Sequence, residues 1–163
     1  MKSMKTLKGK RILVVDDEPD ILETLTALLS ECIVDTASDF EAARKLLEEN
    51  SYDAAILDIM GVDGYRLLEA TTKKGIPALM LTAHALSPDH LVESITKGAH
   101  AYIPKDKIAD IEVFLKDILE AQEKGQSRLG RWFARLEPYF EEKFGADWKK
   151  RPDPDFWRKF YYL

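Results

Sequence analysis

Three aspartates, a threonine and a lysine each follow a short apolar run, and together they carry the groups that a phosphoryl-transfer site needs. Asp16 and Asp17 follow the first run, Asp58 the second, Thr82 the third and Lys105 the fourth. The runs are residues 12–15, 54–57, 78–81 and 101–104. Short apolar runs bounded by turn residues are typical of buried parallel strands, whose ligands bind beyond the carboxyl ends. We therefore expect all five side chains on one rim of a sheet.

The three carboxylates of this rim indicate a divalent cation. Two like charges about 4 Å apart repel by roughly 4 kcal/mol at an effective dielectric near 20, so the cluster needs a cation or a proton to persist. Oxygen ligands with room for water favour Mg²⁺ or Mn²⁺. Lys105 and Thr82 supply donors for phosphate oxygens. Asp58 stands alone at its strand end and is the candidate nucleophile that becomes an acyl phosphate.

Strand and helix patterns alternate five times along the chain. Apolar runs predict strands, and apolar stripes at helical spacing, opened by proline, serine or acidic residues, predict helices. The expected strands are 11–16, 33–37, 54–58, 78–82 and 101–103, and the expected helices are 18–29, 39–50, 65–72, 87–98 and 108–123. This alternation predicts an α/β fold, a doubly wound five-stranded parallel sheet with helices on both faces. The less continuous apolar pattern of 33–37 indicates an edge strand.

The composition is that of a folded protein without a membrane span. Of the 163 residues 45% are hydrophobic, and the formal net charge of -5 argues against general affinity for nucleic acid. No apolar run is long enough to span a membrane, and the single cysteine, Cys32, fits a reducing cytoplasm. We expect a flexible tail over residues 1–9, a main domain over 10–124 and a helical, aromatic-rich extension over 125–163.

Several short motifs occur in order on the five strand–helix units. They are residues 12–19 (ILVVDDEP), 56–60 (ILDIM), 63–64 (DG), 81–83 (LTA) and 98–105 (GAHAYIPK). Together they make residues 10–124 similar to a response-regulator receiver domain of two-component signalling. The resemblance implies the flavodoxin-like receiver fold and a cytoplasmic, bacterial phosphorelay protein. It implies a phosphoprotein that acts as a switch rather than a turnover enzyme.

The resemblance assigns a role to each acid of the rim. Asp58 would accept a phosphoryl group from the phosphohistidine of a sensor histidine kinase or a phosphotransfer protein. Asp17, Asp58 and the backbone carbonyl of Met60 would hold Mg²⁺ (or Mn²⁺), with Asp16 acting mainly through water.

The resemblance also implies a switch. Thr82 and Lys105 would bind phosphoryl oxygens, and Tyr102 would change rotamer with Thr82. His84 and Met60 would modulate hydrolysis of the acyl phosphate. A second copy of the chain or a downstream protein would read the signal. It would bind the face formed by the expected helix 87–98, strand 101–103 and helix 108–123, together with the C-terminal extension.

Two features depart from the usual receiver pattern. Only residues 59–62 separate Asp58 from the Asp-Gly pair, fewer than usual, and Asp106 follows Lys105 where proline is common. The short loop leaves open an alternative, a degenerate receiver that serves as a protein-interaction module without phosphorylation.

Two other classes of protein share parts of this pattern. An aspartyl-phosphate phosphatase or phosphotransferase of the haloacid-dehalogenase type would need a second aspartate where Met60 stands. A flavodoxin-like FMN-binding protein would need a phosphate-binding loop where Asp16 and Asp17 stand, and these carboxylates would repel phosphate. Both are therefore disfavoured.

The last 35 residues are rich in aromatic side chains. They contain eleven of the 16 aromatic residues and all three tryptophans, and residues 126–163 carry a net charge of +3. A helical apolar stripe is formed by Leu129, Trp132, Phe133, Leu136, Phe140 and Phe144. Pro138 would kink this helix or start a new one, Gly145 would end it, and residues 156–162 predict one more short helix. Three alternatives are open for this segment: it completes the core, it forms a dimer or partner interface, or it binds nucleic acid. The small net charge disfavours nucleic-acid binding.

Overall fold

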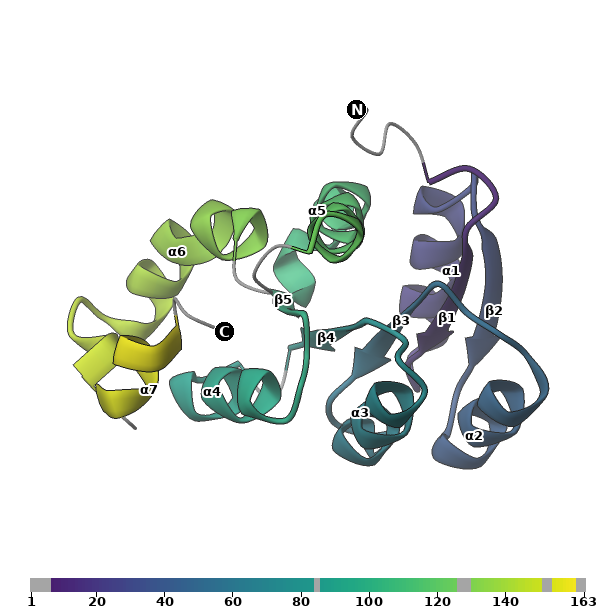
Figure 1. Ribbon diagram of the computed structural model, residues 1–163, viewed down its shortest axis with the longest axis horizontal. Coiled ribbons are helices and arrows are strands. Elements are labelled where there is room, and N and C mark those ends of the chain that lie inside the picture. The colour runs from purple at the N-terminus through teal and green to yellow at the C-terminus, as the bar shows by residue number, and fades with distance from the viewer. Residues whose placement is uncertain (1–6, 84–85, 126–129, 151–153, 161–163) are drawn as a thin grey trace.

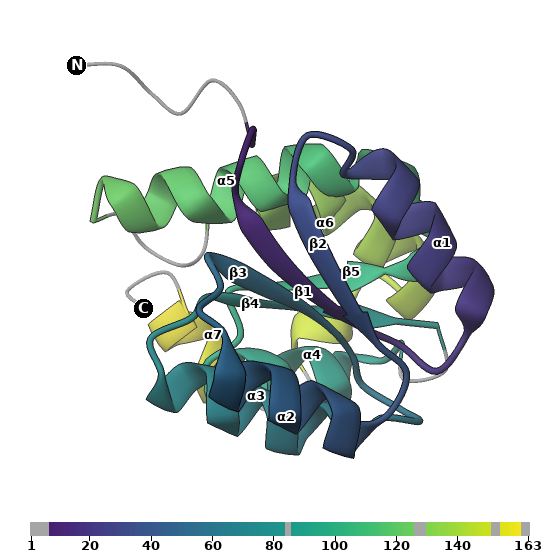
Figure 2. The ribbon, with the colours of Figure 1, turned by 90° about the vertical axis from the view of Figure 1, so that its right-hand side faces the viewer.

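The fold is built on one parallel sheet with the strand order β2-β1-β3-β4-β5. The computed structural model describes residues 7–83, 86–125, 130–150 and 154–160. The strands are β1 (Arg11–Val15), β2 (Ile33–Ala37), β3 (Ala54–Asp58), β4 (Ala78–Thr82) and β5 (Ala101–Pro104). The helices around it are α1 (Pro19–Leu28), α2 (Phe40–Glu49), α3 (Gly64–Lys73), α4 (Pro88–Thr96) and α5 (Ile111–Glu123). Helices α1 and α5 cover one face and α2, α3 and α4 the other, which confirms the predicted doubly wound α/β fold (Figures 1 and 2).

Burial explains the positions of the strands. Every residue of β3, β4 and β5 is buried, because helices cover both faces of the sheet there. Strand β2 has a single buried residue, and its Ile33 is 51% exposed; its place at the end of the strand order confirms the predicted edge strand. Two helices have the N-terminal caps that their residue types suggest. The side chain of Asp39 accepts a hydrogen bond from the N–H of Ala42 over 2.8 Å at the start of α2, and that of Ser87 accepts one from the N–H of His90 over 3.1 Å at the start of α4.

The segment after β5 differs from the prediction. A 3₁₀ helix, η1 (Lys105–Asp110), precedes α5, and the backbone of Lys107 is non-helical at φ -107° and ψ 17°. Hydrophobic periodicity places the helix start at residue 108 because Ile108 is the first apolar side chain of the stripe, and short 3₁₀ turns leave no such pattern.

The C-terminal extension adds α6 (Arg131–Phe144), a 3₁₀ turn η2 (Trp148–Lys150) and α7 (Pro154–Phe160). Pro138 lies inside α6 and does not start a new helix, while Gly145 follows its last residue. Figure 1 shows these elements on the β5 side of the sheet, remote from β2. The buried aromatic side chains among them are Trp132, Phe133, Phe140, Trp148, Phe156 and Trp157. The extension therefore folds back within its own chain; Leu129, Tyr161 and Tyr162 lie outside the described residues.

The N-terminal end of the described chain is tied to the domain. Leu7 is buried at 1% exposure, and the N–H of Gly9 donates to the carbonyl of Glu31 over 2.9 Å. The division of the chain at residues 9 and 124 stays a prediction. Among the described residues, no helix has the length and apolar character that crossing a bilayer requires.

Candidate functional site

Four strand ends bring the predicted side chains together at the carboxyl edge of the sheet. Asp16 follows β1, Asp58 ends β3, Thr82 ends β4 and Lys105 follows β5. The ammonium Nζ of Lys105 lies 2.9 Å from Asp16 Oδ2 and 3.4 Å from Asp58 Oδ1. Asp16, Asp58 and Thr82 are buried, at 0%, 5% and 1% exposure. The lysine therefore bridges two buried carboxylates.

Burial dominates the electrostatics of this site. Removal from water, reinforced by the charge of Asp16, raises the pKa of Asp58 to about 7 from an ordinary value of 3.8. Burial also raises the pKa of Asp16, although the N–H of Glu18 donates to its Oδ1 over 2.9 Å. Burial alone would lower the pKa of Lys105, but hydrogen bonds to Asp16 and Glu18 and the charge of Asp58 raise it above its ordinary value. One ammonium thus faces three carboxyl groups.

The acidic side chains form a donor set that suits a small divalent cation. One carboxylate oxygen from each of Asp16, Asp17 and Glu18 lies within 4.8 Å of the others. Asp17 is exposed while Asp16 is buried, so the cluster is open to water on one side. Oxygen donors with access for water are what Mg²⁺ and Mn²⁺ prefer. The residues present therefore fit the predicted ion.

Two glycines permit the short loop after Asp58. Gly61 has a φ of 87°, and a β-carbon there would lie 2.5 Å from Oδ2 of Asp17. At Gly64 a β-carbon would lie 2.2 Å from the backbone oxygen of Asp58. The N–H of Gly64 donates to the carbonyl of Ile59 over 3.1 Å and closes the loop. The chain thus turns tightly at the strand end, and Gly61 leaves room for the Asp17 carboxylate.

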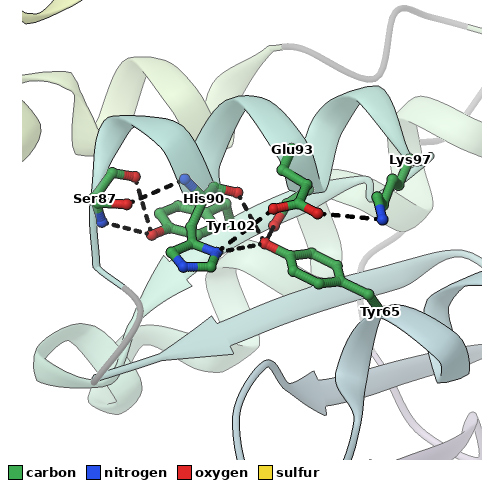
Figure 3. A network of polar contacts seen from close by, with 7 residues as sticks. Tyr65, Ser87, His90, Glu93, Lys97 and Tyr102 are labelled. Carbon is green, nitrogen blue, oxygen red and sulfur yellow. Dashed lines mark hydrogen bonds and ion pairs between the residues drawn. The ribbon is translucent and has the colours of Figure 1, made fainter. Parts of the chain in front are cut away.

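Tyr102 connects β5 with two other parts of the molecule. It lies two residues before Pro104, the residue that pairs with Thr82 of β4. The buried Tyr102 hydroxyl accepts a hydrogen bond from the N–H of Ser87, at the start of α4, over 3.1 Å (Figure 3). The Tyr102 ring also lies against Phe140 of α6, with the ring centroids 6.1 Å apart. The predicted switch residue is therefore in contact with both α4 and the extension.

Of the two residues predicted to modulate hydrolysis the structure describes one, and one further acid joins the site. Met60 lies in the loop after β3 with half of its surface exposed. His84 lies outside the described residues. Glu18 is a site residue that sequence reasoning missed, since its Oε1 lies 2.9 Å from the Nζ of Lys105. Its place directly after the Asp16-Asp17 pair was the available signal, but an acid there is also ordinary at a helix start.

Comparison with known proteins agrees with this geometry. The chain matches the sequence model of the response regulator receiver domain over residues 12–116. It is 36% identical over 104 residues to the two-component response regulator ARR12 of Arabidopsis thaliana, and 35% identical over 105 residues to the transcriptional regulatory protein TcrA of Mycobacterium tuberculosis. A solved receiver domain protein (CheY-like) of Methanospirillum hungatei has a TM-score of 0.66 at 33% identity, covering 72% of this chain and 99% of that one. This likeness confirms the predicted receiver fold.

The curated relatives are longer than the segment they share with this chain. The match covers 60% of this chain and 17% of the Arabidopsis protein, and 61% of this chain and 41% of the mycobacterial one. The DNA-binding response regulator MtrA of Mycolicibacterium smegmatis is 35% identical over 125 residues, which are 69% of this chain and 53% of that protein. The chain thus spans about half or less of the length of these relatives. Since the family match extends over more than half of its residues, from β1 into α5, the chain belongs to the response-regulator receiver family of two-component systems.

Proposed function

We propose that this protein is a cytoplasmic, Mg²⁺-dependent phosphoryl acceptor, in which Asp58 receives the group from the phosphohistidine of a histidine kinase or a phosphotransfer protein. The observation that carries the proposal is the placement of Asp58, a buried carboxylate 3.4 Å from the Lys105 ammonium and next to the acidic cluster. A lone structural aspartate would need no such neighbours.

The transfer is a displacement at phosphorus. An oxygen of the Asp58 carboxylate attacks the phosphorus atom while the bond from phosphorus to the imidazole nitrogen breaks, and that nitrogen keeps the electron pair. The products are an acyl phosphate on Asp58 and a donor histidine whose ring takes up a proton from solvent and becomes neutral. Because burial raises the pKa of Asp58 to about 7, the attacking carboxylate is available at and above neutral pH.

The chain's own residues bind and orient the transferred group. Lys105 carries the positive charge that a phosphoryl oxygen needs, and Thr82, at the adjacent strand end, offers a hydroxyl donor. Asp16, Asp17 and Asp58, with the backbone carbonyl of Met60, would hold Mg²⁺ or Mn²⁺, Asp16 through water. When bound, the ion neutralises the carboxylates and polarises the phosphoryl oxygens.

We infer that phosphorylation alters the face made by α4, β5 and α5, because Tyr102 joins that face to the phosphoryl site. A downstream protein or a second copy of the chain would read the change. The relatives described as transcriptional or DNA-binding regulators extend well beyond the shared segment, so we do not extend nucleic-acid binding to this chain. Bacterial origin stays a prediction, since the relatives include plant as well as bacterial proteins.

Labelling with a small-molecule donor tests the proposal. The full chain is incubated with radiolabelled acetyl phosphate and Mg²⁺, then treated with hydroxylamine, which cleaves acyl phosphates. We expect label that requires Mg²⁺ and is released by hydroxylamine. Label that never appears with either Mg²⁺ or Mn²⁺ would instead support the degenerate receiver, and hydroxylamine-resistant label would point to a different acceptor chemistry.

A further inference from the structure

The extension is fixed on α5 by a pair of ion pairs. Arg135 donates two hydrogen bonds to the carboxylate of Asp117, from Nε to Oδ2 over 2.7 Å and from Nη2 to Oδ1 over 3.1 Å. Arg131 Nη1 lies 2.9 Å from Oε1 of Glu120. The side chains of Asp117 and Glu120 are only 5% and 10% exposed. Two acids three residues apart on α5 thus face two arginines four residues apart on α6, which sets the register of the two helices.

This register brings two adjacent residues of α6, Tyr139 and Phe140, into contact with β5 and with the η1 turn that begins at Lys105. Phe140 lies against the ring of Tyr102 in β5, and both rings are fully buried. The hydroxyl of Tyr139 donates to Oδ2 of Asp106 over 2.9 Å, and the Nζ of Lys107 lies 5.3 Å from the centre of the Tyr139 ring. The extension therefore touches β5 and the η1 turn at once.

Both contacts are next to residues that a phosphoryl group would move. Asp106 directly follows Lys105, whose ammonium is now shared by Asp16, Glu18 and Asp58. A phosphoryl group on Asp58 adds negative charge at short range and would draw the ammonium away from Asp16 and Glu18. The η1 turn begins at Lys105, so this movement would displace the acceptor of the Tyr139 hydrogen bond.

The second contact is linked to the site through α4. The Tyr102 hydroxyl also donates to the carbonyl of Ser87 over 3.4 Å, and Ser87 caps α4 (Figure 3). The α4 helix is held to α3 by Tyr65, whose hydroxyl lies 2.9 Å from Nδ1 of His90. Thr82 also pairs with Pro104, two residues after Tyr102, so a displacement of Thr82 would change the position of Tyr102 against Phe140.

We propose that α6 is a reversible intramolecular cap on the β5–α5 face, and that its docking is coupled to the state of Asp58 through Tyr139 and Phe140. The docked cap stabilises the arrangement of Tyr102 and Asp106 described above, in which Asp16, Glu18 and Asp58 share the Lys105 ammonium, and phosphorylation weakens the docking. This rests on the proposed function, because it requires Asp58 to be the acceptor. Coupling between two sites is reciprocal, so a loosened cap must favour phosphorylation by the same factor.

Phosphorylation of cap variants tests the coupling. The full-length Arg135→Ala variant lacks the two hydrogen bonds to Asp117. The Tyr139→Phe variant lacks only the hydroxyl that donates to Asp106. Arg158→Ala is the matched control, because Arg158 is exposed and, among the described residues, pairs locally with Asp155 of α7. We expect Arg135→Ala to raise the steady-state ratio of phosphorylated to unphosphorylated protein, under acetyl phosphate and Mg²⁺, by about fivefold or more, the lower end of typical allosteric coupling. Tyr139→Phe should raise it in the same direction, and the control should match wild type.

Tryptophan fluorescence follows the cap itself. All three tryptophans lie in the extension, where Trp132, Trp148 and Trp157 are buried. Phosphorylation of wild type should shift their emission to longer wavelength as water reaches them. Wild-type labelling ratios in both cap variants, or lower ones, would overturn the cap, as would labelling of wild type with unchanged emission. Absence of label in every form, wild type included, would refute the proposed function and the cap with it.

Discussion

Lys105 lies closer to Asp16 than to the proposed acceptor, with its Nζ 2.9 Å from Asp16 Oδ2 and 3.4 Å from Asp58 Oδ1. One ammonium therefore compensates several acidic groups in a buried place. Such a site is electrostatically strained without a metal ion, and this strain gives measurable consequences for stability, pH dependence and ion binding.

The first prediction concerns pH. The pKa of Asp58 is about 7 in the folded protein because of burial and the neighbouring charge of Asp16, whereas its ordinary value is 3.8. Between these values the folded protein binds a proton that the unfolded chain does not, so this group lowers the free energy of unfolding as pH rises from about 4 to about 7. Asp58→Asn removes the effect and should raise the free energy of unfolding of the metal-free protein at pH 8 by about 1–3 kcal/mol, since one pKa unit corresponds to about 1.4 kcal/mol.

Urea unfolding in EDTA at pH 5 and pH 8 measures this gain. Asp20→Asn, at an exposed position of the first turn of α1, is the control and should give no pH-dependent gain. The gain of Asp58→Asn should shrink at pH 5 and also when Mg²⁺ is added at pH 8. A gain of equal size at both pH values would contradict the role of the Asp58 charge.

The second prediction concerns Gly61. A methyl group at this position meets the carboxylate of Asp17, whereas at Gly75, which also has a positive φ of 72°, it meets no atom within 4 Å. Both changes to alanine carry the backbone cost of a side chain at positive φ, about 1–3 kcal/mol. Only Gly61→Ala should also weaken Mg²⁺ binding, by about 10- to 100-fold, as when a group that orients a metal ligand is lost. Calorimetric titration with Mg²⁺ decides, and equal affinities for the two variants would remove Asp17 from the ion site.

The third prediction concerns the attachment of the extension. Arg135→Ala leaves the buried carboxylate of Asp117 without its bidentate partner, and should lower the free energy of unfolding by about 1–3 kcal/mol. Arg158→Ala breaks only an exposed pair with Asp155 and should change it by less than about 1 kcal/mol. Urea unfolding followed by circular dichroism compares the two. Equal losses would mean that α6 is not held on α5 as described.

The fourth prediction concerns the route of the signal. A phosphoryl mimic such as beryllofluoride, bound at Asp58 with Mg²⁺, should change hydrogen exchange most in α4 and β5, because Tyr102 connects Ser87 with the strand that ends beside the site. Asp58→Asn treated in the same way is the control. Changes restricted to α1 and α2 would contradict this route.

Much of the fold could be predicted from the sequence because its determinants are local. Uninterrupted apolar runs such as 12–15 and 78–81 belong to strands buried on both faces, and the partly polar run 33–37 belongs to the edge. The candidate site could be predicted from the ends of these runs as well. Parallel strands bring Asp58, Thr82 and Lys105 to one rim of the sheet whatever the conformation of the loops.

The placement of the extension could not be predicted in this way. Its aromatic residues had to be buried, but three alternatives for their partner remained open. The contacts by which the extension packs on its own chain join residues 33 to 38 positions apart, Tyr139 with Asp106 and Phe140 with Tyr102, and no spacing rule connects such pairs. Of the two alternatives for Pro138, a kink in the helix or the start of a new one, the second is wrong, because one helix spans it, with Phe133 and Phe140 buried on either side.

Mapping the acceptor residue tests the central claim most directly. The full chain is phosphorylated with acetyl phosphate and Mg²⁺, and the acyl phosphate is reduced with borohydride, which converts the modified aspartate to homoserine. Peptide mass spectrometry then locates that residue. The account predicts homoserine at position 58 and no labelling of Asp58→Asn, while Asp53→Asn, five residues earlier, labels as wild type. Homoserine at Asp16 or Asp17, or undiminished labelling of Asp58→Asn, would contradict it.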